Sequence, residues 1–220
     1  MSPTATTARD ALTAQLERLY AIERELQSAL ETLSTDVSID TLDDMRTMEC
    51  REQLQYVIDQ HREETDAHLE RIENAFDALG AEPDTRPVPA LDGLVADKEA
   101  FNNVVLNDGL RPLFYVQTTL QLEAVECTAY ETTMALASAL EDGETESTSR
   151  ADAEDADTDE MTDAGDAVVD ALERNYDDER RMRTDLEAVA DGEALETLLA
   201  ASPVDDAPRE SLDRSRRESP

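Results

Sequence analysis

The sequence has little positive charge and almost no lysine. Lysine and arginine together number 19 among 220 residues, against 54 aspartates and glutamates, and Lys98 is the only lysine. The formal net charge is −35 at pH 7. Binding to nucleic acid or to an anionic membrane needs clustered cations, so this composition argues against both kinds of partner.

Long apolar runs and metal-type cysteine pairs are also absent. The sequence contains no run of 18 apolar residues, which is about the length needed to cross a membrane. Residues 1–5 lack the cationic and apolar parts of a signal peptide. Cys50 and Cys127 form no C-x-x-C pair, and a reducing cytosol favours free thiols. The sequence therefore predicts a soluble cytoplasmic protein.

The abundant acid, paired with arginine rather than lysine, is typical of proteins from cells with molar internal salt. Carboxylates retain their hydration in such a cytoplasm, while the salt screens their mutual repulsion. We therefore expect the chain to come from a salt-in halophile of archaeal type. It follows that an acidic residue indicates a functional site only where it stands in place of an apolar residue.

Apolar residues recur at helical spacing along nearly the whole chain, with no competing alternation of period two. Residues 142–163 are acidic and nearly without large apolar side chains, so we predict a disordered linker there and a disordered tail over 201–220. The predicted helices are a first one carrying Leu12 to Leu33, a second from near Ser38 or Asp40 to Gly80, then 90–105, 112–140, 166–190 and a short one over 193–200.

These elements predict an all-α fold, an antiparallel four-helix bundle with an extra short helix, forming one domain over residues 1–200. The stretch after Gly80 is rich in proline and polar residues, and it is long enough for a crossover connection.

Each long helix carries polar residues within its apolar stripe. They are Glu23 in the first helix, His61, Glu64 and His68 in the second, Glu123 and the neighbouring Glu126 in the third, and Glu179 in the last. Burying an ionised carboxylate is costly unless it is paired or bound to a cation. Four carboxylates and two imidazoles can ligate and nearly neutralise two metal ions, so the pattern predicts a metal site. The alternative is that these acids lie at stripe edges and reach solvent.

Several segments resemble the YciE/YciF family, a ferritin-like group described as a domain of unknown function. The segments are LYAIEREL at 19–26, HREETDAHLERI at 61–72 and LEAVECTAY at 122–130. Family members typically read A-E-K-Q-L, H-x-E-E-T and V-E-H-Y-E-x-x-x-Y there. In addition, ALDGLV at 90–95 is similar to the family's M-E-G-L-I, and DDER at 177–180 to its E-E-E-K. The resemblance covers about residues 10–190, with an insertion around 34–45 and the acidic linker.

The resemblance implies a ferritin-like bundle, a di-iron or di-manganese centre, a homodimer and an association with stress responses. Carried over by position, it implies a carboxylate set of Glu23, Glu64, Glu123, Glu126 and Glu179, with His61 matching the family's histidine. The Glu-x-x-His pairs of ferritin-like centres are missing.

One departure bears on the charge of the site. The fourth position after Glu179 is Arg183, which could pair with a buried carboxylate and replace the charge of a metal. Three functions therefore stay open: a stress-associated metal-binding protein, a di-metal oxidase or peroxidase acting on iron or peroxide, and a metal-free helical scaffold.

Overall fold

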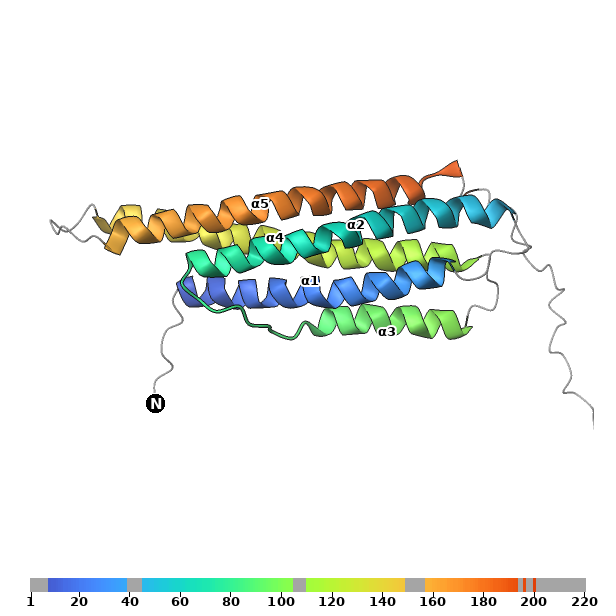
Figure 1. The fold of residues 1–220 in the computed structure, drawn as a ribbon, viewed down its shortest axis with the longest axis horizontal. Helices are drawn as coiled ribbons and strands as arrows, with labels where there is room; N and C mark the ends of the chain where they lie inside the picture. The colour runs from blue at the N-terminus through green and yellow to red at the C-terminus, as the bar shows by residue number, and fades with distance from the viewer. Residues whose placement is uncertain are drawn as a thin grey trace, which may run out of the picture.

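The computed structural model describes residues 8–38, 45–104, 110–148 and 157–193, together with Glu196 and Ala200. Within these ranges all regular secondary structure is helical, which confirms the predicted all-α class. The helices are α1 (Ala8–Ser38), α2 (Met45–Ala78), α3 (Pro89–Val104), α4 (Arg111–Thr148) and α5 (Asp157–Ala190) (Figure 1).

The four long helices form a bundle in which each packs against two neighbours. α1 and α5 both contact α2 and α4, so α1 lies diagonally opposite α5, and α2 opposite α4. In Figure 1, α1 and α5 run from left to right while α2 and α4 run from right to left, so neighbouring helices are antiparallel. This order requires the crossover between α2 and α4 that the sequence predicted, and the crossover contains α3.

The crossover begins with a helix cap that needs glycine. Gly80 has a φ of 59°, a left-handed conformation that L side chains disfavour. Its N–H donates to the Asp77 carbonyl at 2.9 Å, and the Ala81 N–H donates to the Phe76 carbonyl at 3.0 Å. These two bonds form a Schellman motif, which ends α2 and turns the chain back along the bundle.

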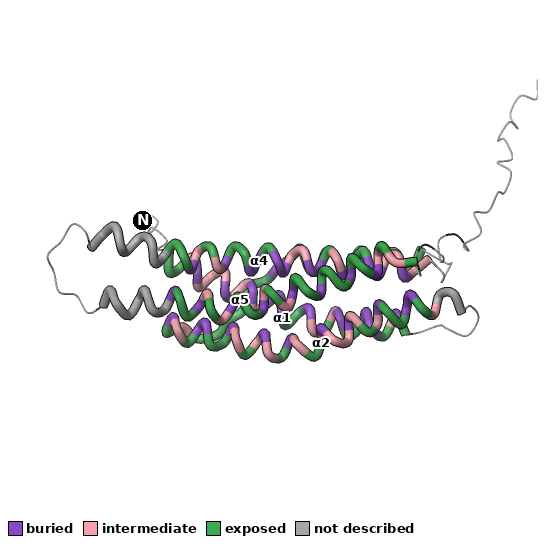
Figure 2. The backbone as a smooth tube through the Cα atoms, turned by 90° about the horizontal axis from the view of Figure 1, so that it is seen from above, coloured by how far each residue is buried: buried purple, intermediate pink, exposed green. Residues whose placement is uncertain are grey.

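The core runs along the bundle axis, and its buried residues recur as purple segments along the helices in Figure 2. The predicted leucine stripe of α1 is completely buried at Leu12, Leu16, Leu19 and Leu30. The opposite faces are polar, and none of the helices in the described part of the chain is long and apolar enough to cross a membrane. The hydrophobic effect therefore fixes which face of each helix points inward.

The short helix α3 lies outside the four-helix ring, against α4 and α1. Leu91 and Lys98 are buried along it. The Lys98 Nζ lies 2.5 Å from the Asp36 Oδ2 near the end of α1 and 2.8 Å from the Glu99 Oε1. The chain's single lysine thus joins the crossover helix to the bundle.

Two sequence-based boundaries need correction. α1 continues to Ser38, so the second helix does not begin there; residues 39–44 lie outside the described part. The predicted linker over 142–163 is helical at both ends, because α4 reaches Thr148 and α5 begins at Asp157. Alanine and glutamate are good helix formers, and carboxylates in the first turn of α5 favour a helix N-terminus.

The structure describes only part of the predicted linker and of the predicted short helix, and none of the predicted tail. The middle of the linker, residues 149–156, and the tail over 201–220 lie outside the described residues. Of the predicted short helix over 193–200, the structure describes three positions, all of them helical.

We expect Leu30→Ala to lower the free energy of unfolding by about 2–5 kcal/mol, because it leaves a cavity in a fully buried stripe. The control is Val104→Ala, since Val104 is 75% exposed. Its free energy of unfolding should stay within about 0.5 kcal/mol of the parent. Urea denaturation followed by circular dichroism measures both, and equal losses would contradict the assigned core.

Candidate metal centre

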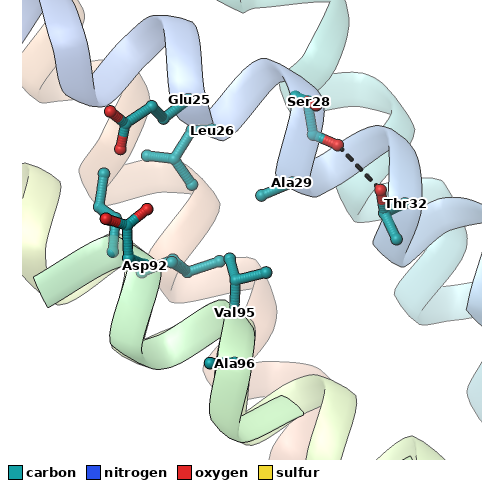
Figure 3. A pocket seen from close by; sticks show the side chains of 10 residues that line it. Glu25, Leu26, Ser28, Ala29, Thr32, Asp92, Val95 and Ala96 are labelled. Carbon is teal, nitrogen blue, oxygen red and sulfur yellow. Dashed lines mark hydrogen bonds between the residues drawn. The ribbon is translucent and has the colours of Figure 1, made fainter. Parts of the chain in front are cut away.

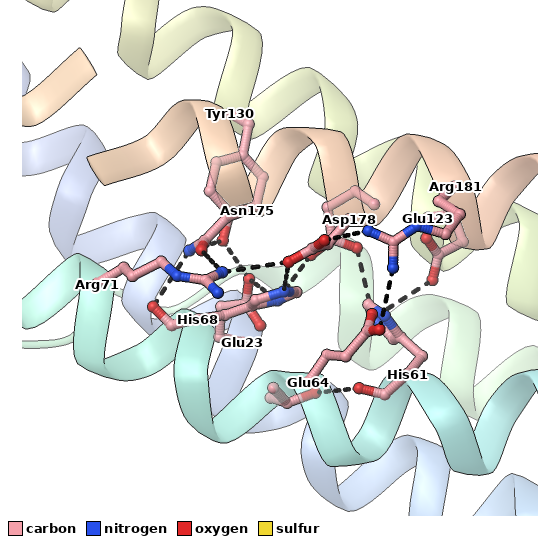
Figure 4. A network of polar contacts seen from close by, with 12 residues as sticks. Glu23, His61, Glu64, His68, Arg71, Glu123, Tyr130, Asn175, Asp178 and Arg181 are labelled. Carbon is pink, nitrogen blue, oxygen red and sulfur yellow. Dashed lines mark hydrogen bonds and ion pairs between the residues drawn. The ribbon is translucent and has the colours of Figure 1, made fainter. Parts of the chain in front are cut away.

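Six of the seven polar residues singled out in the sequence are buried, and their ligand atoms lie close together. Figure 4 shows four of them, Glu23, His61, His68 and Glu123, facing one another between the helices. α1 supplies Glu23, α2 supplies His61 and His68, α4 supplies Glu123 and Glu126, and α5 supplies Glu179. The four glutamates and His68 are 0% exposed, and His61 is 2% exposed. The alternative that these acids lie at stripe edges and reach solvent is therefore wrong for these four glutamates.

The six side chains form two overlapping groups. His61, Glu123, Glu126 and Glu179 each offer a ligand atom, and these atoms all lie within 4.8 Å of one another. Glu23, His68 and Glu179 form a second group with the same spacing. Glu179 belongs to both, so one carboxylate lies between two sets of metal-ligand atoms.

The histidines face the shared carboxylate from two levels of α2. His61 Nε2 lies 3.4 Å from Glu179 Oε2 and 3.9 Å from Glu123 Oε1. His68 Nδ1 lies 3.0 Å from Glu179 Oε1 and 3.4 Å from Glu23 Oε1. His68 follows His61 by seven residues, which is about two helical turns. Both imidazoles therefore lie on the same face of α2.

Most polar atoms in this cluster lack hydrogen-bond partners. Both carboxylate oxygens of Glu123, Glu126 and Glu179 have none, and neither do one oxygen of Glu23, both ring nitrogens of His61 and Nδ1 of His68. Buried polar groups in proteins are normally satisfied, so a cluster of unpartnered ones is an arrangement that bound ions or ordered water would complete. The donor set, carboxylate oxygen and imidazole nitrogen, fits divalent iron or manganese.

Burial and mutual repulsion control the protonation of the acids. Burial, with the nearby Glu179 carboxylate, raises the pKa of Glu123 and of Glu126 well above the usual value. Burial raises the pKa of Glu179 to about 7, although the ion pair with His68 opposes the shift. Without a cation, the cluster is therefore held partly in its neutral form.

The two imidazoles respond in opposite directions. Burial lowers the pKa of His61 to about 4. Burial also acts to lower the pKa of His68, but the close contacts with the carboxylates of Glu179 and Glu23 outweigh it and raise the pKa to about 10. His61 is thus neutral, the form that ligates metal, whereas His68 carries a proton that a metal ion would displace.

A hydrogen-bond network on one side of the cluster positions Glu23 and His68. The Tyr130 hydroxyl donates to Glu23 Oε1. The Asn175 Nδ2 donates to the Tyr130 oxygen at 2.9 Å and to the His68 carbonyl at 3.1 Å. Arg71 in turn donates to Asn175 Oδ1 at 2.7 Å. Such supporting groups fix the orientation of metal ligands.

Sequence reasoning missed Asn175 and Asp178. Asn175 is completely buried, three residues after Leu172 in the stripe of α5, so its position in the periodic pattern was a usable signal. Asp178 Oδ2 lies 3.3 Å from His68 Nε2, and its pKa is lowered because hydrogen bonds from Arg181, Arg71 and His68 outweigh the effect of burial. No periodicity marks Asp178, which lies at the rim.

Glu64 is the one predicted ligand that the structure places apart from the buried cluster. It is half-buried, and its Oε1 accepts a hydrogen bond from Arg181 at 3.1 Å. Its ligand atom lies within 4.8 Å of those of His68 and Asp178. Arg183, which could have neutralised a buried acid, instead donates to Glu187 at 3.0 Å.

The missing Glu-x-x-His pairs have structural substitutes. On α4, Glu126 occupies the third position after Glu123 and faces the same cluster. On α2, the histidines lie three residues before and four residues after Glu64 and supply the imidazoles without a preceding buried glutamate. The centre therefore contains four carboxylates and two imidazoles, the same number that the Glu-x-x-His pattern provides, but distributed differently over the helices.

Solved structures share the arrangement of the helices. YcfI from Rhodopseudomonas palustris is 22% identical with a TM-score of 0.64, over 85% of this chain and 97% of that one. The E. coli stress protein YciF is 19% identical with a TM-score of 0.62, over 84% of this chain and 94% of that one. These likenesses show the fold.

A comparison with curated proteins found no match. The sequence model of the family described as Domain of unknown function (DUF892) matches residues 7–199. This match spans the whole bundle and agrees with the resemblance in the sequence motifs. The chain belongs to the DUF892 family, the YciE/YciF-type group.

Proposed function

We propose that this chain is a ferritin-like metal-binding protein that holds two iron or manganese ions in the buried cluster. The observation that carries the proposal is the set of unpartnered carboxylate oxygens on four glutamates with no solvent exposure. Four carboxylates carry four negative charges, which two divalent ions balance.

The two ligand groups assign a role to each side chain. His61, Glu123 and Glu126 would hold one ion, Glu23 and His68 the other, and Glu179 would contribute to both. Bound iron or manganese supplies redox capacity there. The chain's own residues exclude water, orient the carboxylates and keep Tyr130 hydrogen-bonded to Glu23.

The setting of this activity also belongs to the proposal. One structural relative is described as a stress protein, and we assign the chain a stress-associated role on that likeness. The acid-rich, lysine-poor composition supports a halophilic cytoplasm as its location. We further propose that it acts as a homodimer, without nucleic acid or membrane as partners.

A second candidate is an oxidase or peroxidase acting on iron or peroxide. Tyr130 favours it, because a buried phenol hydrogen-bonded to a candidate ligand can exchange an electron and a proton with the site. Faster Fe(II) oxidation by the protein than by buffer, slowed in Tyr130→Phe at unchanged metal content, would establish turnover. Stable binding without turnover would leave the binding function alone.

The metal-free scaffold has less support. Without a metal, protons or cations of the chain must neutralise the buried acids, and the predicted candidate Arg183 pairs with Glu187 at the surface. The ion pairs of Glu23, Glu123 and Glu179 are with the two histidines, one of which is held neutral by burial.

Metal content tests the proposed site. Protein loaded with Mn(II) in molar KCl should contain about two ions per chain by elemental analysis. Glu179→Gln removes the carboxylate that both groups share and should lose both ions, whereas Glu126→Gln should keep about one because only one group contains Glu126.

Glu63→Gln is the matched control, because Glu63 is an exposed acid on the same helix as the two histidines. Its metal content should equal that of the parent. Folded parent protein that takes up no metal, or unchanged content in Glu179→Gln, would refute the proposal.

The pH dependence of stability should have opposite signs in metal-free and loaded protein. His68 has a folded pKa of about 10 against an ordinary 6.5, so its stabilising proton is lost as the pH rises. The pKa of Glu179 is raised to about 7, and protonating it stabilises the fold as the pH falls. Metal-free protein should therefore gain up to about 1.4 kcal/mol per pH unit per proton between pH 9 and pH 7.

Loaded protein should show the reverse, since metal binding requires deprotonated ligands and weakens as the pH falls. Urea titrations at pH 7, 8 and 9 measure both slopes. His68→Gln should flatten the slope of the metal-free form. Metal-free protein that becomes less stable from pH 9 to pH 7 would contradict the clustering of the acids.

A further inference from the structure

The buried centre needs a route by which a cation can reach it. Its six candidate ligands have exposures between 0% and 2%, so none presents its ligand atoms to bulk solvent. The following inference concerns that route and rests on the function proposed above.

A small cavity between α2 and α5 reaches one ligand of the centre, His61. His61, Glu64, Arg181 and Asp185 line it, and its volume is about 10 Å³, room for about one water molecule. His61 is buried, and neither of its ring nitrogens has a hydrogen-bond partner. An unsatisfied imidazole thus lines the same cavity as two acidic side chains, Glu64 and Asp185.

Two larger cavities lie elsewhere and contain none of the six candidate ligands. One of about 400 Å³ lies between α1 and α3 (Figure 3), and its lining includes the apolar side chains of Leu26, Leu91 and Leu122. Another of about 250 Å³ is lined by residues of α1 and α4 and by Ala90. Apolar side chains would oppose the passage of a hydrated cation from the first of these.

Arg181 lines the α2/α5 cavity, and Figure 4 shows its guanidinium joined to Asp178 and Glu64. Its guanidinium donates to Glu64 at 3.1 Å and also to Asp178. Arg181 is half-exposed, and ion pairs of exposed groups are weak and readily exchanged. Arg181 therefore forms ion pairs with two carboxylates, and another cation can replace it there.

The acids beneath this arginine form a third set of ligand atoms. Those of Glu64, His68 and Asp178 all lie within 4.8 Å of one another. His68 connects this set to the buried centre, because its Nε2 lies 3.3 Å from Asp178 and its Nδ1 lies 3.0 Å from Glu179. One imidazole thus faces the rim with one nitrogen and the centre with the other.

We propose that Glu64 and Asp178, next to His68, are the uptake site for the divalent cation, and that Arg181 is a displaceable plug over it. A divalent cation replaces the guanidinium between the two carboxylates, and Arg181 swings into solvent. The cation then moves inward to the nitrogens of His61 and to Glu179. Glu64 is in this view a transit ligand, which accounts for its position outside the buried cluster.

Loading kinetics test the proposal. Metal-free protein is mixed with Co(II) in molar KCl in a stopped-flow instrument, and the ligand-field absorbance gives the rate. Arg181→Gln should load roughly three- to tenfold faster than the parent, because it removes the plug and a positive charge from the route. Glu64→Gln should load more slowly by a similar factor. Final metal content, from elemental analysis, should equal the parent's in both variants.

Arg183→Gln is the matched control. It removes the same charge from the same helix near Glu123, but Arg183 pairs with Glu187 and does not line the α2/α5 cavity. Its loading rate should match that of the parent. Equal acceleration in both arginine variants would show a general charge effect and overturn the proposal.

Two other outcomes are decisive. Loss of metal content in Glu64→Gln as large as in Glu179→Gln would make Glu64 a ligand of the centre and refute its transit role. Parent-like loading rates in Arg181→Gln with full metal content would refute the uptake site and leave the proposed function intact. A parent protein that binds no Co(II) or Mn(II) would refute both.

Discussion

Four carboxylates that share a dry interior are the constraint on which the rest of the structure depends. Each comes from a bundle position that would otherwise be apolar, and three of them have no hydrogen-bond partner for either oxygen. Ionised, they would repel one another in a medium that screens poorly. The chain relieves this strain by protonation, as the raised pKa values of Glu123 and Glu126 show. Bound cations would relieve it without the proton, so stability and ligand binding depend on the same side chains.

One short segment of α5 sets the geometry of this cluster. Asn175 reaches Tyr130 and the backbone of α2, Asp178 faces the outer nitrogen of His68, and Glu179 lies between both ligand groups. A rotation of α5 by one residue, about 100°, would remove Glu179 from the centre. The apolar contacts of Val168 and Leu186, both completely buried, hold that rotation in place. Packing far from the site therefore determines which carboxylate is shared.

Helical periodicity explains how much of this could be predicted. A polar residue within an apolar stripe is visible in one sequence, and this signal identified Glu23, Glu179 and both histidines, all of which are buried. It could not separate Glu64 from them, because a stripe about 100° wide does not resolve its own edge. His68 contacts both Asp178 and Glu179 only because α2 and α5 pack in one particular register. No local sequence pattern encodes that register.

The chain contains many exposed acids and a few buried ones, and salt screens the charge of the exposed acids far more than that of the buried ones. At molar ionic strength the screening length falls to about 3 Å, so exposed carboxylates attract cations only near contact. The net charge of −35 would then do little to draw a metal ion from a distance in the saline cytoplasm that we expect. If the chain binds metal as proposed, capture would depend on acids at the rim that touch the ion, and retention on buried acids that screening does not reach. The divalent charge is favoured there because Coulomb attraction doubles relative to a monovalent ion, and the dry interior preserves that difference.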